Sequence, residues 1–158
     1  MSSSRSNHLK NVFYSLLQPG TVIGFIPYFV FSYFPEQISL PNFLEWFSIL
    51  FFLLGLSLLI WSISIFSIYS EGTISPIDPS NKLVLQGPYK YSRNPMYLGV
   101  LMCLISEAIY FSSTALFLYT LSMFLLFHTF IIFHEEPRQK KIFGKPFEKY
   151  LDSVNRWI

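Results

Sequence analysis

The segment GPYKYSRNPMYLG, residues 87–99, concentrates side chains that could hold a polar ligand. Tyr89, Tyr91 and Tyr97 offer flat aromatic faces with hydroxyl groups, which suit a purine ring or an organic cation. Arg93 offers a planar guanidinium that can bind a carboxylate or a phosphate through two hydrogen bonds. These residue types predict a binding site for a small molecule that carries both a ring and a charge.

The same segment predicts the start of a helix at Asn94 and Pro95. Asparagine is a common N-cap, and proline is well tolerated at the first helical position. The free amide groups at a helix N-terminus also favour a bound anion. A ligand site at a helix start therefore explains the segment better than a simple membrane-interface loop does.

A second group of ionisable residues, His134, Glu135 and Glu136, follows the last long apolar segment. Carboxylates at the C-terminal end of a helix oppose the helix macrodipole, so a pair of them there suggests a function. They could accept hydrogen bonds from the hydroxyl groups or the amine of a ligand. A solvated helix end, paired with Arg138 or Lys140, is the structural alternative. His134 could accept a proton near neutral pH.

Isolated polar residues in the apolar segments give weaker signals. His128 and His134 are six positions apart, which does not place them on one helix face, so we predict no metal site. We expect His128 to face a neighbouring helix and to hydrogen-bond to a backbone carbonyl. We expect Glu107, near the end of its segment, to reach the outer membrane interface. The single cysteine, Cys103, excludes a disulfide framework and a cysteine metal site.

The elements that must position these residues are membrane helices. The 158-residue chain is 52% hydrophobic and only 13% charged, whereas soluble domains carry about 25% charged residues. A membrane-spanning helix needs about 20 largely apolar residues. Four segments qualify or come close, namely residues 12–34, 46–69, 97–111 and 115–133.

We therefore predict an all-α integral membrane protein with four transmembrane helices, the last two of which form a tight hairpin. Short amphipathic helices should follow on the cytoplasmic side, because apolar residues recur at helical spacing after Pro137, with an interruption at residues 144–146. Residues 1–158 form a single membrane domain. Its two-helix N-terminal part is 1–70, and its C-terminal part, 71–158, holds nearly every ionisable residue.

The positions of the charges predict the orientation. All eleven Lys and Arg residues fall before the first span, between the second and third spans, or after the fourth. The positive-inside rule then places both termini of this multi-pass protein in the cytoplasm. A cleaved signal peptide is the alternative for residues 12–34, but no small-residue cleavage site follows them. The net charge of +2 does not indicate a nucleic-acid partner, so the expected partners are the lipid bilayer and a small molecule.

Two motifs together give a family resemblance. KLVLQGPYKYSRNPMYLG, followed one helical hairpin later by HEEPRQKKIFGKPFEKYLDSVNRW, resembles the integral-membrane methyltransferases of the isoprenylcysteine carboxyl methyltransferase type. Phospholipid N-methyltransferases belong to the same broad group. The resemblance covers residues 71–158. It implies that S-adenosylmethionine binds in a cytoplasmic pocket between the loop, the last span and the C-terminal helices, and that a lipid-like substrate enters from the bilayer.

The resemblance also implies roles for single residues. The residues that it places at the cofactor are Lys82, Leu83, Val84, Tyr89, Asn94, Pro95, Met96, Tyr97 and Glu135. The residues that it gives supporting or catalytic roles are Arg93, Glu136, Phe143, Gly144 and Tyr150. Many relatives have histidine where this chain has Asn94, which keeps a hydrogen-bonding group but removes a possible charge.

One departure bears on the substrate. Relatives that methylate a carboxyl group carry an arginine one helical turn before the glutamate pair, and this chain has Ile131 there. An unpaired carboxylate in an apolar pocket is costly, so an amine or a thiol is a better acceptor than the carboxylate of prenylcysteine. These nucleophiles are largely protonated at neutral pH and need a base, for which Glu136 and His134 are the candidates.

Two other classes of function fit parts of the sequence. NADPH-dependent membrane reductases of the sterol type share a similar hairpin and R-[HN]-P-x-Y motif, but they usually have longer chains. A non-catalytic membrane subunit could retain the residues around the site without the activity. The sequence does not determine the methyl acceptor, the pathway or the oligomeric state.

Overall fold

The computed structural model describes residues 19–70 and 82–158. Its elements are η1 (Gly20–Phe25), α2 (Ile26–Tyr33), α3 (Phe43–Tyr69), η2 (Gly87–Lys90), α4 (Pro95–Tyr110), α5 (Thr114–Phe130), η3 (Ile131–Glu135), α6 (Glu136–Phe143) and α7 (Lys145–Ser153). Within the described residues there is no β-strand, and the single isolated bridge joins Gln37 and Ser113. The predicted all-α class is confirmed.

In the part of the chain that the structure describes, two helices are long and apolar enough to cross a bilayer. α3 has 27 residues, and α5, η3 and α6 form one continuous helix of 30 residues, Thr114–Phe143. At about 1.5 Å per residue, α3 is about 40 Å long and exceeds the hydrocarbon core of about 30 Å. The segments Gly20–Tyr33 and Pro95–Tyr110 are shorter apolar helices. The described residues thus contain two candidate spanning helices, and the four-span topology stays a prediction.

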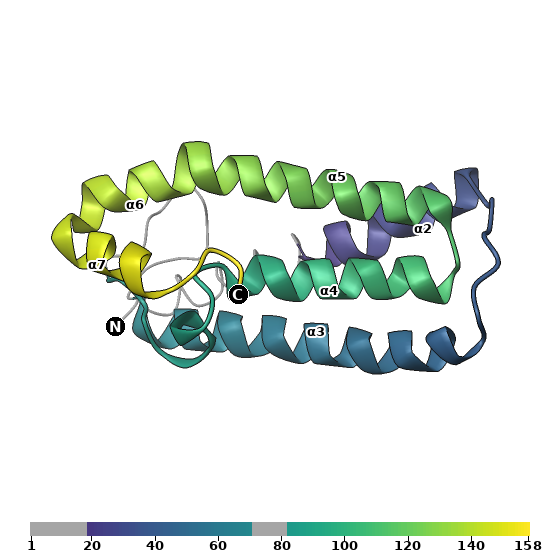
Figure 1. Ribbon diagram of the computed structural model, residues 1–158, viewed down its shortest axis with the longest axis horizontal. Helices are drawn as coiled ribbons and strands as arrows, with labels where there is room; N and C mark the ends of the chain where they lie inside the picture. Colours follow the sequence, from purple (N-terminus) through teal and green to yellow (C-terminus); the bar gives the residue numbers. More distant parts are fainter. Residues whose placement is uncertain (1–18, 71–81) are drawn as a thin grey trace, which may run out of the picture.

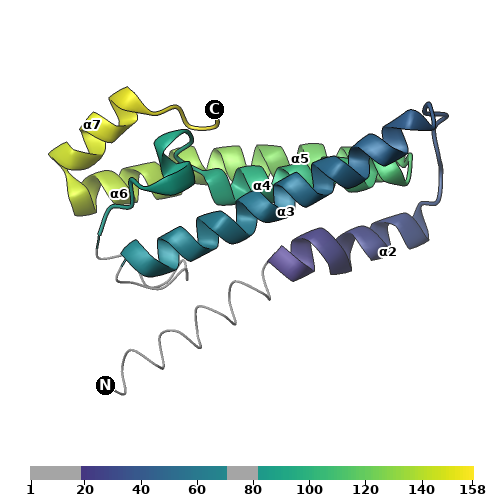
Figure 2. The ribbon, with the colours of Figure 1, turned by 90° about the horizontal axis from the view of Figure 1, so that it is seen from below.

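The helices share one long axis. In Figure 1, α3, α4 and α5 run side by side, with α4 between the other two and α2 behind them. α6 and α7 gather at the end of the bundle where α4 begins. The chain after α7 folds back toward the start of α4, on the side of the molecule opposite to α2 (Figure 2). This arrangement brings the loop before α4, the end of the long helix and the C-terminus to one end of the bundle.

Two buried glycines set the contact between α3 and α4. A Cβ atom on Gly99 would lie 2.9 Å from the carbonyl oxygen of Gly55, and one on Gly55 would lie 2.7 Å from Cβ of Met102. Small residues allow membrane helices to approach closely, so that van der Waals contact holds them together. The two glycines therefore fix the start of α4, and the loop before it, against α3.

A three-residue turn joins α4 and α5 at the other end. Ser112 has a φ of 49°, and the Ser113 amide donates to the carbonyl of Ala108 over 3.1 Å. The Ser113 hydroxyl caps α5 by accepting from the Leu116 amide. The predicted tight hairpin is therefore present as a structural unit.

Glu107, near this turn, is partly exposed, and its position at the outer interface stays a prediction. Its Oε2 atom is buried and has no hydrogen-bond partner among residues 19–70 and 82–158. This oxygen atom therefore faces the neighbouring helices.

Candidate active site

Tyr89 anchors the loop that precedes α4. The 3-10 turn Gly87–Lys90 begins at Gly87, whose φ of 58° favours glycine. The side chain of Ile65 in α3 occupies the space beside Gly87 that a Cβ atom would enter. The Tyr89 side chain is only 8% exposed, and its hydroxyl donates to the carbonyl of Ser62 over 3.5 Å. The Tyr150 hydroxyl of α7 donates to the carbonyl of Tyr89 over 2.6 Å. The loop is thus clamped between α3 and α7.

Both tyrosines keep their hydroxyl protons. Burial raises the pKa of Tyr150 to about 12, and burial also raises the pKa of Tyr89 well above its ordinary value. Desolvation disfavours the charged phenolate in each case. Tyr89 and Tyr150 therefore act as hydrogen-bond donors that hold the loop, and not as proton acceptors.

Asn94 stands at the N-cap position of α4, with Pro95 as the first helical residue, as predicted. The Asn94 side chain, however, makes no capping bond. Its Nδ2 atom donates to the carbonyl oxygen of Arg156 over 3.1 Å, and its backbone amide donates to the hydroxyl of Ser92 over 3.1 Å. The carbonyl of Arg156 competes successfully for this side chain because the C-terminal segment lies directly beside the helix start.

Glu135 meets the start of α4 through Tyr97. The Tyr97 hydroxyl donates to Oε1 of Glu135 over 3.0 Å, although 38 positions separate the two residues. The Tyr97 ring also lies on Phe127 of α5, with ring centroids 4.7 Å apart. This pair brings together the two motifs of the sequence, GPYKYSRNPMYLG and HEEP.

Glu136 binds two arginines. Arg156 donates to it through Nε and Nη2, over 2.8 and 3.0 Å, and Nη1 of Arg93 lies 3.3 Å from Oε1. The hydrogen bonds to the Glu136 carboxylate raise the pKa of Arg156 above its ordinary value, since they stabilise the guanidinium. Arg93 is mostly buried, and its Nε atom has no hydrogen-bond partner within the described part of the chain. A buried donor of this kind is available to an anionic ligand.

A family model for phospholipid methyltransferase matches residues 44–146. The match covers more than half of the 158-residue chain. The chain belongs to the phospholipid methyltransferase family. The sequence-based resemblance is thereby confirmed, and this family is one of membrane methyltransferases. A search of curated proteins found no match.

The region matched to the phospholipid methyltransferase family contains every predicted cofactor-binding residue and the predicted catalytic residues Arg93, His134 and Glu136, whereas Tyr150 lies beyond it. Tyr89, Arg93, Asn94, Tyr97, Glu135 and Glu136 all contribute to the contacts at one end of the bundle. Val84 and Pro95 are buried beside them, and Met96 packs against the apolar core. The match ends at residue 146, before Arg156 and the rest of the C-terminal segment.

Three of the residues singled out in the sequence are exposed. The Tyr91 side chain is 74% exposed, and Lys82 is also exposed. His134 is exposed and stacks on Phe130, with ring centroids 5.1 Å apart. The roles assigned to Lys82 and His134 stay predictions, and Tyr91 presents its face to the surroundings.

Sequence reasoning missed the residues that the C-terminal segment supplies. Arg156 contacts Ser92, Asn94 and Glu136, and the backbone carbonyl of Asn155 accepts from the amide of Arg93 over 3.0 Å. The sequence signal for these residues was weak. It consisted of the segment NRW, in which a charged and an aromatic residue directly follow the last amphipathic segment. No spacing rule links these residues to a motif about 60 positions earlier.

Proposed function

We propose that the protein transfers a methyl group from S-adenosylmethionine to an amine or a thiol of a lipophilic acceptor in the bilayer. The observation that carries this proposal is the position of Glu135. Its carboxylate lies at the start of α4, bound by Tyr97, within the part of the chain that matches the phospholipid methyltransferase family.

The polar groups at this end of the bundle suit the cofactor. S-adenosylmethionine carries an adenine ring, ribose hydroxyl groups, an ammonium group and a carboxylate. A carboxylate has about four acceptor positions, and Glu135 uses one of them for Tyr97, so it can accept from hydroxyl groups or an ammonium group. Arg93 has a buried Nε donor without a partner in the described chain, which suits the ligand carboxylate.

The protein's part in the reaction is alignment and exclusion of water. When bound, S-adenosylmethionine supplies a methyl group that its sulfonium makes electrophilic. Tyr97 holds the carboxylate of Glu135, while Glu136 holds the guanidinium of Arg93. Fixed groups of this kind favour reaction because they remove the freedom of the reactants before the chemical step.

The acceptor follows from Ile131. This side chain is 1% exposed and lies on the helix one turn before the glutamate pair, where carboxyl methyltransferases carry an arginine. An apolar side chain cannot neutralise a carboxylate, so the site favours an amine or a thiol. Glu136 is engaged by two guanidinium groups, which weakens it as a base. This leaves His134 as the proton acceptor of the proposal.

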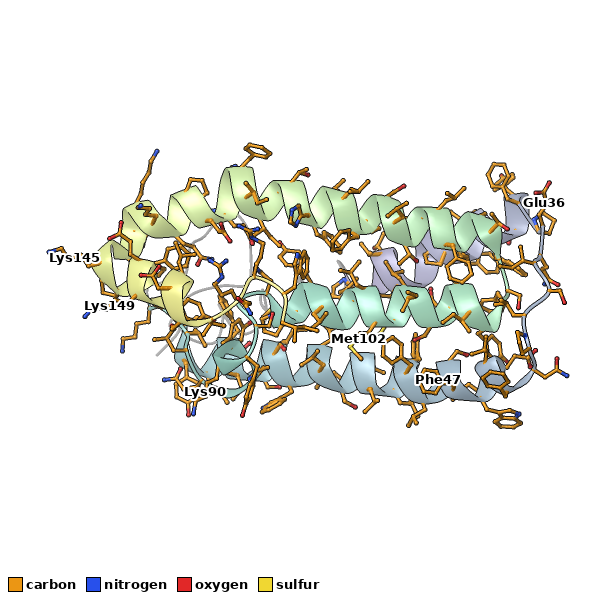
Figure 3. All side chains as sticks on the ribbon, viewed as in Figure 1. Glu36, Phe47, Lys90, Met102, Lys145 and Lys149 are labelled. Atoms are coloured by element: carbon orange, nitrogen blue, oxygen red, sulfur yellow. The ribbon has the colours of Figure 1, made fainter. Side chains whose placement is uncertain are left out.

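We infer that the end of the bundle with α6 and α7 faces the cytoplasm. Lys90, Lys145 and Lys149 lie at this end and Glu36 lies at the other (Figure 3). This distribution agrees with the positive-inside rule for a protein with both termini in the cytoplasm and four spans. The apolar residues of α7, Phe147 and Tyr150, are buried against the rest of the protein, and its lysines are exposed, so α7 is amphipathic.

Methyl transfer by the purified protein in lipid nanodiscs tests the proposal. Radiolabelled S-adenosylmethionine is supplied with phosphatidylethanolamine, a long-chain amine, a long-chain thiol or prenylcysteine, and label in the lipid fraction is counted. We expect transfer to an amine or a thiol. Transfer to prenylcysteine alone would contradict the assignment of the acceptor, and thermal stabilisation by NADPH without stabilisation by S-adenosylmethionine would contradict the assignment of the cofactor.

Two glutamate variants sharpen the same experiment. Glu135→Ala removes the carboxylate bound by Tyr97 and should lower both cofactor binding and transfer by about 100-fold, the factor expected for loss of about 3 kcal/mol of charged hydrogen bonds. Glu148→Ala removes a carboxylate of α7 that pairs with Lys140 on the surface, and should leave both unchanged. Equal effects of the two changes would contradict a role for Glu135 in the site.

A further inference from the structure

The C-terminal segment returns to the membrane-spanning helix at His128. The indole Nε1–H of Trp157 donates to Nδ1 of His128 over 3.2 Å. The two rings are nearly parallel, with an interplanar angle of 15° and centroids 6.2 Å apart. Phe124 stacks on His128 and contacts Trp157, with centroid distances of 5.7 and 5.4 Å. We call Phe124, His128 and Trp157 the aromatic stack.

The bond from Trp157 selects one form of the imidazole. An indole nitrogen can only donate a hydrogen bond, so Nδ1 of His128 must carry a lone pair. The ring is therefore neutral, with its hydrogen on Nε2, because a doubly protonated ring would place two N–H groups against each other. His128 is consequently a hydrogen-bond donor at Nε2. The backbone carbonyl expected from the sequence is not the partner of this residue.

His128 is partly exposed and lies within the long apolar helix Thr114–Phe143. His128 precedes Glu135 by seven positions, which is about 10 Å along the helix axis toward the centre of α5. Its neighbours in the stack are aromatic, and Nε2 has no hydrogen-bond partner in the part of the chain that the structure describes. An N–H donor in apolar surroundings is costly unless an acceptor is present. A molecule that enters from the membrane can supply this acceptor.

We propose that His128 recognises the methyl acceptor by donating from Nε2 to an uncharged oxygen of that molecule, a hydroxyl group or an ester carbonyl. This inference rests on the proposed function. Two residues then determine which acceptor binds. Ile131, one turn away, excludes a carboxylate, and the neutral N–H of His128 selects an uncharged oxygen. Trp157 is the positioning residue, since it fixes the ring and its hydrogen.

Nitrogen NMR of the full-length protein tests this proposal without relying on turnover. The chain has three histidines, so ¹⁵N-histidine labelling gives three imidazole signals, which single substitutions assign. Nanodiscs are titrated with 1-hexadecanol, with methyl palmitate and, as a control, with hexadecane. We expect His128 to show hydrogen on Nε2 and a saturable shift with one or both oxygen-bearing probes. Hexadecane should cause no shift.

The outcomes distinguish hydroxyl from ester and can overturn the proposal. A shift with hexadecanol alone identifies a hydroxyl-bearing acceptor, and a shift with methyl palmitate alone identifies an ester. Hydrogen on Nδ1, or equal responses to all three probes, overturns the proposal, as does the absence of any response. Binding of radiolabelled S-adenosylmethionine is measured on the same samples, so failure of the proposed function is detected separately.

Variants connect the stack to the reaction. His128→Gln places an amide donor near the position of Nε2 and should keep at least a third of kcat/KM for the best acceptor, whereas His128→Phe should lower it about tenfold, mainly through KM.

Trp157→Phe keeps a ring but removes the N–H, and should give a mixture of imidazole tautomers. Thr129→Val, at the next and exposed position, is the matched control and should change nothing. Equal losses for the Gln and Phe variants would contradict the role of the donor.

Discussion

Two regions of the molecule, the polar end with α6 and α7 and the contact between α3 and α4, are held together in different ways. At the end with α6 and α7, hydrogen bonds join residues far apart in the sequence: Tyr150 to Tyr89 across 61 positions, and Asn94 to the carbonyl of Arg156 across 62. Along α3, the hydroxyls of Ser57, Ser62 and Ser64 donate to carbonyls four positions earlier in the same helix. One region is fixed by directional contacts, and the other by the fit of helices at Gly55 and Gly99.

The difference follows from the surroundings of each region. In lipid, a hydroxyl group that finds a partner in its own helix needs nothing from a neighbour, so helix association depends on close packing. At the polar end, charged and polar groups can select one another over long sequence distances. Changes of volume should therefore damage the α3–α4 contact most, and changes of single polar atoms should damage the end with α6 and α7 most.

The largest effect is expected for Gly99→Leu. A side chain there would collide with the backbone of Gly55 and Leu59, so α3 and α4 would have to separate, at a cost of about 3 kcal/mol or more. Titration with SDS unfolds the protein in detergent micelles, and the change in the free energy of unfolding measures the loss. Gly24→Ala is the control, because no atom lies within 4 Å of the added Cβ; it should change stability by at most about 1 kcal/mol.

Arg156→Met should have the next largest effect. It removes two charged hydrogen bonds to Glu136, whose side chain is largely buried, and should cost about 2 kcal/mol after allowance for the partial exposure of the arginine. Arg156→Lys keeps the charge but not the two-pronged geometry, and should fall between Met and the native residue. A lysine variant as stable as the native protein would show that charge alone holds Glu136.

Tyr150→Phe should cost about 1 kcal/mol, since it removes the hydrogen bond to the carbonyl of Tyr89 and leaves the ring in place. The same SDS titration measures it. Tyr91→Phe, on the exposed tyrosine of the same loop, should have no measurable effect. Similar losses for the two changes would mean that the loop is not clamped by Tyr150.

The smallest effect is expected for Glu148→Gln. The ion pair of Glu148 with Lys140 spans 2.9 Å, but both side chains are about half exposed, so its loss should cost less than about 0.5 kcal/mol. Repeating the measurement at high salt should remove the difference. A loss as large as that of Arg156→Met would contradict the division between a buried network and a solvated surface.

Much of the fold and part of the site could be predicted from the sequence. The apolar segments required helices, because backbone groups in lipid must be satisfied within their own segment, and α3 and α5 follow that rule. The pairing of Asn94 with Pro95 predicted the start of α4. The motif that contains Arg93 and the motif that contains Glu135 indicated a shared site, and the Tyr97–Glu135 bond places them together.

The partners of the polar residues could not be predicted in the same way. The sequence did not predict that Oε2 of Glu107 is buried, and it gave His128 a backbone partner where the structure has a tryptophan from the C-terminus. Neither outcome follows from helical spacing, since each depends on which face of a neighbouring segment is nearby.

The sequence by itself therefore determined that this chain is an all-helical membrane protein with a methyltransferase motif at a helix start. Helix formation in an apolar chain and the chemistry of a short motif are local properties, so the order of residues is sufficient to specify them. Only the tertiary structure decided that Arg156 holds Glu136 and that Trp157 holds His128. Those contacts exist because the chain folds back after α7 and brings residues 20 and 29 positions apart within hydrogen-bonding distance.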